Sequence, residues 1–176
     1  MWKGIGLLYA RRGTELVSLI EGGAQERGRR AGTENLPAIA GMAAAFSEAC
    51  VNRQENTIKT AKLRDYVISR LSEIPGAVLN GPDPVRRLPG NVSFCIKGVN
   101  SESLLLQFSQ HGICASAGSA CMYGSIEPSH VMLAIGRSWE LASGSLRLTF
   151  SAENTMEEAE LICSAMPGII SKLRGE

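Results

Sequence analysis

Apolar positions recur at helical spacing in three stretches of the chain. Asn35, a residue type that caps helices, and Pro37 predict the start of the first helix. The second predicted helix has apolar residues at four-residue spacing and is expected to stop at Pro75-Gly76. Its opposite face, which is expected to point outward, carries Lys62, Arg64, Asp65 and Arg70. The third is near the C-terminus, where Pro167 is expected to remove a hydrogen bond and kink it. The apolar faces are Ile39, Met42, Ala43, Phe46 and Cys50; Leu63, Val67 and Leu71; and Ala159, Ile162, Cys163, Met166, Ile170 and Leu173.

Short apolar runs between glycine and proline turns predict strands. One is expected as a buried strand over 5–9, and the others near 77–79, 92–96, 112–115 and 145–150. A helix is predicted from about Ser101 to Gln110, and Pro128 suits the first turn of another that runs to about Ile135. Alternation of short strands and helices predicts an α/β fold.

The length and net charge of the chain limit the classes of protein to which it can belong. The 176 residues suffice for one ordinary core, or for a small domain with a piece of a larger one. A net charge of +1 gives no general field that attracts nucleic acid or an anionic membrane. No apolar run reaches the roughly eighteen residues of a membrane helix, and no secretory leader is evident, so the cytoplasm is the expected compartment.

The cysteines indicate reduced thiols. Five is an odd number in a chain too large to need disulfide staples. Cys50, Cys95 and Cys163 lie in apolar periodic runs and are expected to be buried. Cys114 and Cys121 lack a C-x-x-C spacing and make a poor zinc pattern with His130, so no metal site is predicted.

A single cysteine stands within a run of very small residues. Residues 116–120 show neither a period of 2 nor one of 3.6, which favours a mobile tether for the thiol of Cys121. Such a thiol attacks only as a thiolate, and the sequence shows no base beside it. An inert exposed cysteine in a glycine-rich turn is the alternative.

Two further segments carry candidate binding groups. Arg147, inside an apolar strand, is expected to need a carboxylate partner, either a substrate or a structural ion pair. Residues 26–33 combine glycines, guanidinium groups and the Thr33 hydroxyl ahead of a helix, which suits a phosphate, although a solvated basic loop or a partner-docking patch has the same composition. His111 and His130 are interpreted as capping or surface histidines and not as catalytic groups.

Four sequence blocks together resemble one enzyme family. Residues 116–131 read Ser-Ala-Gly-Ser-Ala-Cys-Met-Tyr-Gly-Ser-Ile-Glu-Pro-Ser-His-Val, which is similar to the active-site loop of cysteine desulfurases of the NifS and IscS type. Residues 3–13, 22–35 and 145–151 match further blocks of that family. The resemblance therefore extends over nearly the whole chain.

The resemblance implies a fold and a site. The chain is expected to be the small C-terminal domain of a fold-type-I pyridoxal phosphate enzyme, residues 56–176 with the cysteine loop 114–130, preceded by a large-domain remnant at 1–55. Cys121 would take sulfur from L-cysteine as a persulfide, leaving alanine, for iron–sulfur cluster or other sulfur-cofactor biosynthesis. Arg147 would hold the substrate carboxylate. Thr33 would reach the cofactor phosphate of the neighbouring subunit in a homodimer, and an iron–sulfur scaffold or another acceptor protein would receive the sulfur.

Three departures from the family pattern qualify these expectations. The Schiff-base lysine would precede Met1, and Lys3 matches a later lysine of the family, so the chain is expected not to desulfurate cysteine alone. Met122-Tyr123 replaces small hydroxyl residues, and Trp2 replaces a proline. Two alternatives stay open: a non-catalytic persulfide carrier or scaffold-binding module, and a gene fragment without function.

Overall fold

The computed structural model describes residues 4–117 and 128–176. The chain divides into two compact units, residues 1–53 and 54–176. The first contains the short helix α1 (Gln25–Gly28) and the longer α2 (Leu36–Val51). As predicted, Asn35 caps α2: its side-chain oxygen accepts a hydrogen bond from the backbone N–H of Ala38 at 3.2 Å. No residue of α2 is buried, and the predicted burial of Cys50 is wrong because no residue within 4–53 covers that face of α2.

The strand predicted over residues 5–9 is not formed. Leu7, Leu8 and Tyr9 are 74 to 82% exposed. A strand exists only when its backbone is hydrogen-bonded to a neighbour, and no described residue makes such a bond to residues 5–9. An apolar run between glycines thus shows that a segment can be a strand, but not that a partner lies beside it.

The second unit is built on a three-stranded antiparallel sheet in the order β1-β2-β3. Its strands are β1 (Ala77–Leu79), β2 (Asn91–Ile96) and β3 (Ser145–Thr149), all three near their predicted positions. Phe94 in the central strand lies opposite Leu79 on one side and Leu146 on the other. This register directs the largest apolar side chains of the sheet to one face.

The strand predicted over residues 112–115 is wrong. These residues instead close the end of the preceding helix, where Ile113 donates its backbone N–H to the carbonyl oxygen of Phe108 at 2.9 Å. Gly112 adopts the left-handed conformation, with φ 73°, that this turn requires. Only the next residue, Ser116, pairs with the sheet, as an isolated antiparallel bridge to Arg147.

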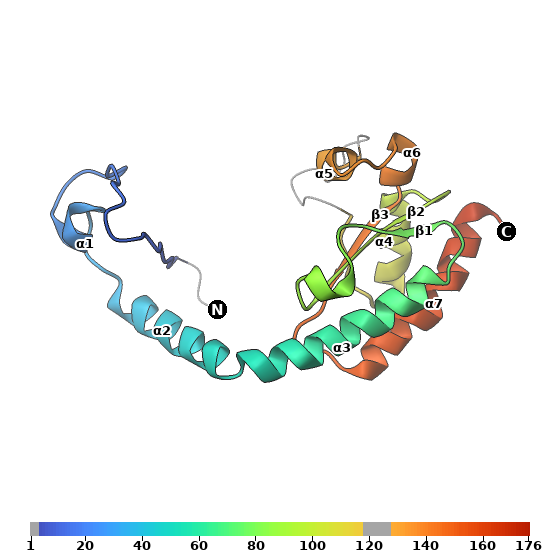
Figure 1. Ribbon diagram of the computed structural model, residues 1–176, viewed down its shortest axis with the longest axis horizontal. Coiled ribbons are helices and arrows are strands. Elements are labelled where there is room, and N and C mark those ends of the chain that lie inside the picture. Colours follow the sequence, from blue (N-terminus) through green and yellow to red (C-terminus); the bar gives the residue numbers. More distant parts are fainter. Residues whose placement is uncertain (1–3, 118–127) are drawn as a thin grey trace. The chain divides into compact units, whose positions relative to one another are not determined.

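Three long helices cover the apolar face of the sheet (Figure 1). They are α3 (Arg53–Ser72), α4 (Ser101–Gln110) and α7 (Met156–Arg174). A capping box of Thr155 and Glu158 starts α7, and the helix continues through Pro167 to a left-handed Gly175. Two short helices, α5 (His130–Ala134) and α6 (Trp139–Ala142), and a 3-10 turn at Pro84–Arg86 complete the unit.

The core of the second unit lies between these helices and the sheet. Its most deeply buried large side chains, all under 2% exposed, are Phe94, Phe108, Leu71, Ile96, Leu104, Leu146 and Met166. Arg64, placed by the sequence on the outward face of α3, is only 5% exposed. The prediction failed because residues 87–88 lie over this face, and Arg64 donates to the carbonyl oxygen of Leu88 at 3.2 Å. In the part of the chain that the structure describes, no helix is long and apolar enough to cross a membrane.

Candidate active site

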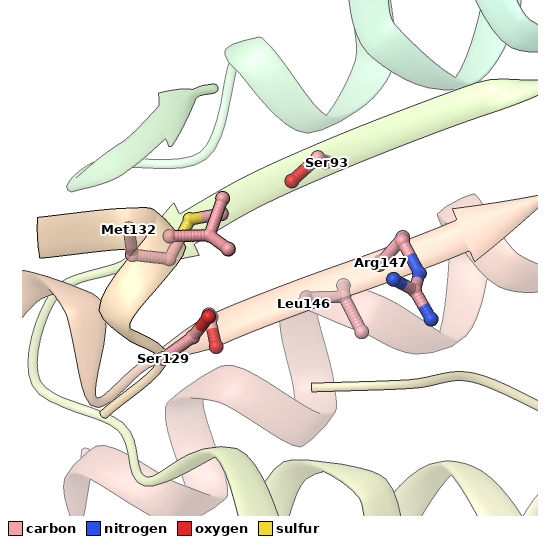
Figure 2. A pocket seen from close by; sticks show the side chains of 7 residues that line it. Ser93, Ser129, Met132, Leu146 and Arg147 are labelled. Atoms are coloured by element: carbon pink, nitrogen blue, oxygen red, sulfur yellow. The ribbon is translucent and has the colours of Figure 1, made fainter. Parts of the chain in front are cut away.

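Arg147 lines a small cavity that lies between strands β2 and β3 and the segment of helix α5 (Figure 2). The cavity has a volume of about 90 Å³. Ser93 of β2, the register partner of Arg147, lies on the same side of the sheet. The other lining residues are Ser129, Val131, Met132, Ser145 and Leu146. One cationic group, three serines and apolar walls therefore meet at one place.

The guanidinium of Arg147 is exposed and available to a ligand. Alternation along β3 buries Leu146 and Leu148 and turns Arg147 to the opposite side, so the expected burial penalty does not apply. Within residues 4–117 and 128–176 no hydrogen bond or salt bridge engages its side chain. The alternative of a structural ion pair thus has no partner among the described residues.

The chain on both sides of residues 118–127 lies at this cavity. On the N-terminal side, Arg147 and Ser116 exchange two backbone hydrogen bonds of 2.6 and 3.0 Å, and the hydroxyl of Ser145 donates to the carbonyl oxygen of Ala117 at 2.9 Å. On the C-terminal side, Ser129, which is 8% exposed, lines the cavity and precedes α5. Cys121 itself lies outside the described residues.

Sequence reasoning identified Arg147 but missed the serines around it. Ser93 and Ser145 lie on strands, where small polar residues give no signal of their own. Ser93 could have been found only from the register that places it opposite Arg147. Ser129 carries the N-cap pattern of a helix start, yet its side chain makes no capping hydrogen bond.

Thr33 belongs to the first unit and is not among the residues that line this cavity. It is exposed, in the loop between α1 and α2. Glu26 and Arg27 are left-handed, with φ 49° and 60°, and the side chain of Gln25 accepts the backbone N–H of Gly32 at 3.1 Å. This hydrogen bond holds the loop in a tight turn ahead of the Thr33 hydroxyl. Hydroxyl and guanidinium donors on such a turn are the chemistry that a phosphate group binds.

The described cysteines differ in their environment. Burial raises the pKa of the Cys95 thiol, although a hydrogen bond from Asn80 and the charge of Arg137 act against it. Burial also raises the pKa of Cys163 to about 11. Both groups therefore stay protonated near neutral pH and are poor nucleophiles, whereas Cys114 is exposed. Among the described residues no three His, Cys, Asp or Glu side chains form a group that could hold a metal ion.

His111 takes a capping position, and His130 is an exposed residue at the start of a helix. His111 follows α4, and its Nδ1 lies 2.8 Å from the carbonyl oxygen of Gln107. His130 is the first residue of α5. Neither histidine lines the cavity of Arg147.

Comparison with known proteins identifies the family. A family model described as aminotransferase class-V matches residues 2–162. The chain belongs to the class-V aminotransferase family. Within this family it is similar to a protein from Clostridium botulinum named cysteine desulfurase IscS, with 45% identity over 174 residues. A protein of the same name from Methanosarcina thermophila is 45% identical over 172 residues. These matches cover 98% of the chain and 44% and 42% of the two relatives, so the class-V chain spans less than half of their length.

A solved structure confirms the fold and the resemblance inferred from sequence. A NifS-like protein from Rickettsia africae aligns with a TM-score of 0.76 and 31% identity, over 89% of this chain and 40% of that one. The class-V chain therefore has the mixed α/β fold of part of a NifS-like protein, as its sequence blocks predicted.

Proposed function

We propose that this chain supplies the substrate-anchoring and sulfur-accepting portion of a cysteine desulfurase. In this proposal, residues 1–55 are a remnant of the large cofactor domain and 56–176 form the small domain. The observation that carries the proposal is the exposed guanidinium of Arg147 in a cavity flanked by Ala117 and Ser129. These residues precede and follow the segment that contains Cys121. The names of the similar proteins supply the reaction class.

Arg147 binds the α-carboxylate of L-cysteine. Its planar guanidinium can donate two parallel N–H bonds to a carboxylate, which fixes both the position and the orientation of the amino acid. The hydroxyl groups of Ser93 and Ser129 line the same cavity and offer further polar contacts to a small zwitterion. A cavity of about 90 Å³ favours a small amino acid over a large one.

Cys121 accepts the sulfur. It is four residues from Ala117, and an extended chain of that length reaches at most about 14 Å. Its thiolate attacks the sulfur atom of the bound cysteine, so a sulfur–sulfur bond forms while the carbon–sulfur bond breaks. The carbon takes up a proton and leaves as alanine, and the persulfide on Cys121 passes its outer sulfur to an acceptor protein such as an iron–sulfur scaffold.

Pyridoxal phosphate, when bound, supplies the electron sink that loosens the carbon–sulfur bond. The residues present fit its phosphate end: the hydroxyl of Thr33 and the guanidinium groups of Arg29 and Arg30 are exposed donors beside a tight turn. Thr33 would hold the phosphate of a neighbouring subunit in a homodimer. No described lysine lines the cavity of Arg147. The four described cysteines are free thiols, which suits the cytoplasm.

The test joins this chain to the part of a relative that lies outside the match. The N-terminal segment of the Clostridium botulinum protein, fused ahead of Met1, provides the residues that the chain does not cover. We expect the fusion to form alanine from L-cysteine, and Arg147→Gln to raise the Michaelis constant at least tenfold, because a charge-assisted pair is lost. Arg86→Gln, an exposed arginine outside the cavity, is the matched control. An unchanged Michaelis constant in Arg147→Gln would refute the anchoring role. Sulfur accepted by the unfused chain, and only from a separate desulfurase, would favour a carrier module.

A further inference from the structure

Helix α5 forms one wall of the Arg147 cavity but has almost no packing of its own. It is five residues long and contains no buried residue. Val131 and Leu133 are 46 and 37% exposed, so apolar contacts contribute little to its position. Its Met132 nevertheless lines the cavity, across from Ser93 on β2 (Figure 2). Its neighbour α6, the buried residues 128 and 129 just before it, and polar contacts are what remain to hold this wall in place.

Arg137, just after α5, makes the polar contacts that can do so. Its backbone N–H donates to the carbonyl oxygen of Met132 at 3.0 Å, which closes the helix around a left-handed Gly136 with φ 84°. Its guanidinium reaches across to the end of β1, where Nε donates to the side-chain oxygen of Asn80 at 2.8 Å and Nη2 donates to the carbonyl oxygen of Leu79 at 2.7 Å. One residue therefore both ends α5 and ties it to the sheet.

Asn80 connects Arg137 to the opposite wall of the cavity. It is 2% exposed, and its amide nitrogen donates to the hydroxyl of Ser93 at 3.2 Å and to the sulfur of Cys95 at 3.3 Å. Its backbone N–H also donates to the carbonyl oxygen of Ser93 at 2.8 Å. A continuous chain of hydrogen bonds thus runs from Met132 through Arg137 and Asn80 to Ser93, from one wall to the other.

We propose that Arg137 is a positioning residue that, through Asn80, sets the separation between the α5 wall and the strand wall of the Arg147 cavity. It touches no cavity ligand itself, because it is not among the lining residues. This inference rests on the proposed function only in treating the cavity as the carboxylate site. A small cavity makes that separation matter: a shift of α5 by a fraction of an ångström changes the space open to an amino acid beside Arg147.

The test compares three variants of the full chain by amide hydrogen exchange and by the NMR signal of the Arg147 side-chain Nε–H. Arg137→Leu removes both side-chain bonds, Arg137→Lys keeps one cation that can donate, and Arg86→Leu removes an exposed arginine whose side chain is 76% exposed. We expect Arg137→Leu to speed exchange in residues 130–137 about tenfold and to shift the Arg147 signal, while exchange in β2 changes little. Arg137→Lys should restore most of the protection, and Arg86→Leu should change neither readout.

Unchanged exchange in α5, or an unmoved Arg147 signal, in Arg137→Leu would overturn the proposal. If Arg137→Leu does not fold, Arg137→Gln, which retains a single amide donor, is measured in its place with the same expected direction. A titration of the unmodified chain with L-alanine tests the carboxylate site at Arg147 separately from the positioning role of Arg137. An Arg147 signal that does not respond to L-alanine contradicts the carboxylate site, whereas the exchange rates and the Arg147 signal of the Arg137 variants decide the role of Arg137.

Discussion

Glycine at position 144 is a steric requirement of the turn that leads into β3. A Cβ built there would lie far inside contact distance of the backbone carbonyl oxygen of Ile96 and 3.0 Å from that of Val99. The obstacle cannot rotate away, because Ile96 donates its own N–H to the carbonyl oxygen of Gly144 at 2.9 Å. Gly144→Ala must therefore push β2 and β3 apart next to Ser145.

The loss of stability in Gly144→Ala can be estimated, and Gly168→Ala in the same chain serves as its control. Overpacking costs typically about 1–3 kcal/mol, and a fixed backbone obstacle places Gly144→Ala at or above the upper end. For a unit of this size, that loss lowers the melting temperature by about 10 °C. Gly168→Ala, inside α7 with open space around its Cβ position, should instead raise stability by about 0.5–1 kcal/mol. Thermal unfolding followed by circular dichroism measures both, and a Gly144→Ala variant as stable as the unmodified chain would refute the steric reasoning.

Two further predictions concern the cysteines. The pKa of Cys163 is about 11 in the folded chain, against about 8.5 for an ordinary thiol in the unfolded chain. The contribution of this thiol to the free energy of unfolding is therefore fully present below pH 8.5 and is lost as the pH rises toward 11. Cys163→Ala should flatten the decline in urea-unfolding free energy over this range relative to Cys50→Ala, and equal slopes would contradict the prediction. In maleimide labelling at neutral pH, the exposed Cys50 and Cys114 should react in the native chain and the buried Cys95 only on unfolding. Labelling of Cys95 as fast as that of Cys50 would show that the core opens.

The sequence predicted the parts of the fold that local signals determine. The cap at Asn35, the helix over Ser101–Gln110 and the strand from Ser145 were found because capping residues and apolar periodicity act within a few residues. The strand expected at 5–9 and the outward face of Arg64 failed because both depend on what lies beside a segment. A one-dimensional pattern contains no information on such neighbours.

The same division applies to the candidate site. Arg147 was found because an arginine amid strand residues is unusual, and the family resemblance gave it a role. Its exposure, its serine neighbours and the tie from Arg137 to Asn80 follow from register and from contacts between residues 57 positions apart. The sequence therefore singled out the candidate arginine, whereas the side chains that surround it could not be predicted from the sequence.

The most direct test of the proposed function is the location of sulfur after turnover. The fusion with the N-terminal segment of the Clostridium botulinum relative is incubated with L-cysteine, alkylated, digested and analysed by mass spectrometry, alongside its Cys121→Ser and Arg147→Gln variants. We expect one added sulfur atom on Cys121, less of it in Arg147→Gln, and none at that position in Cys121→Ser. Sulfur on Cys114 instead, or alanine formation that persists in Cys121→Ser, would contradict it.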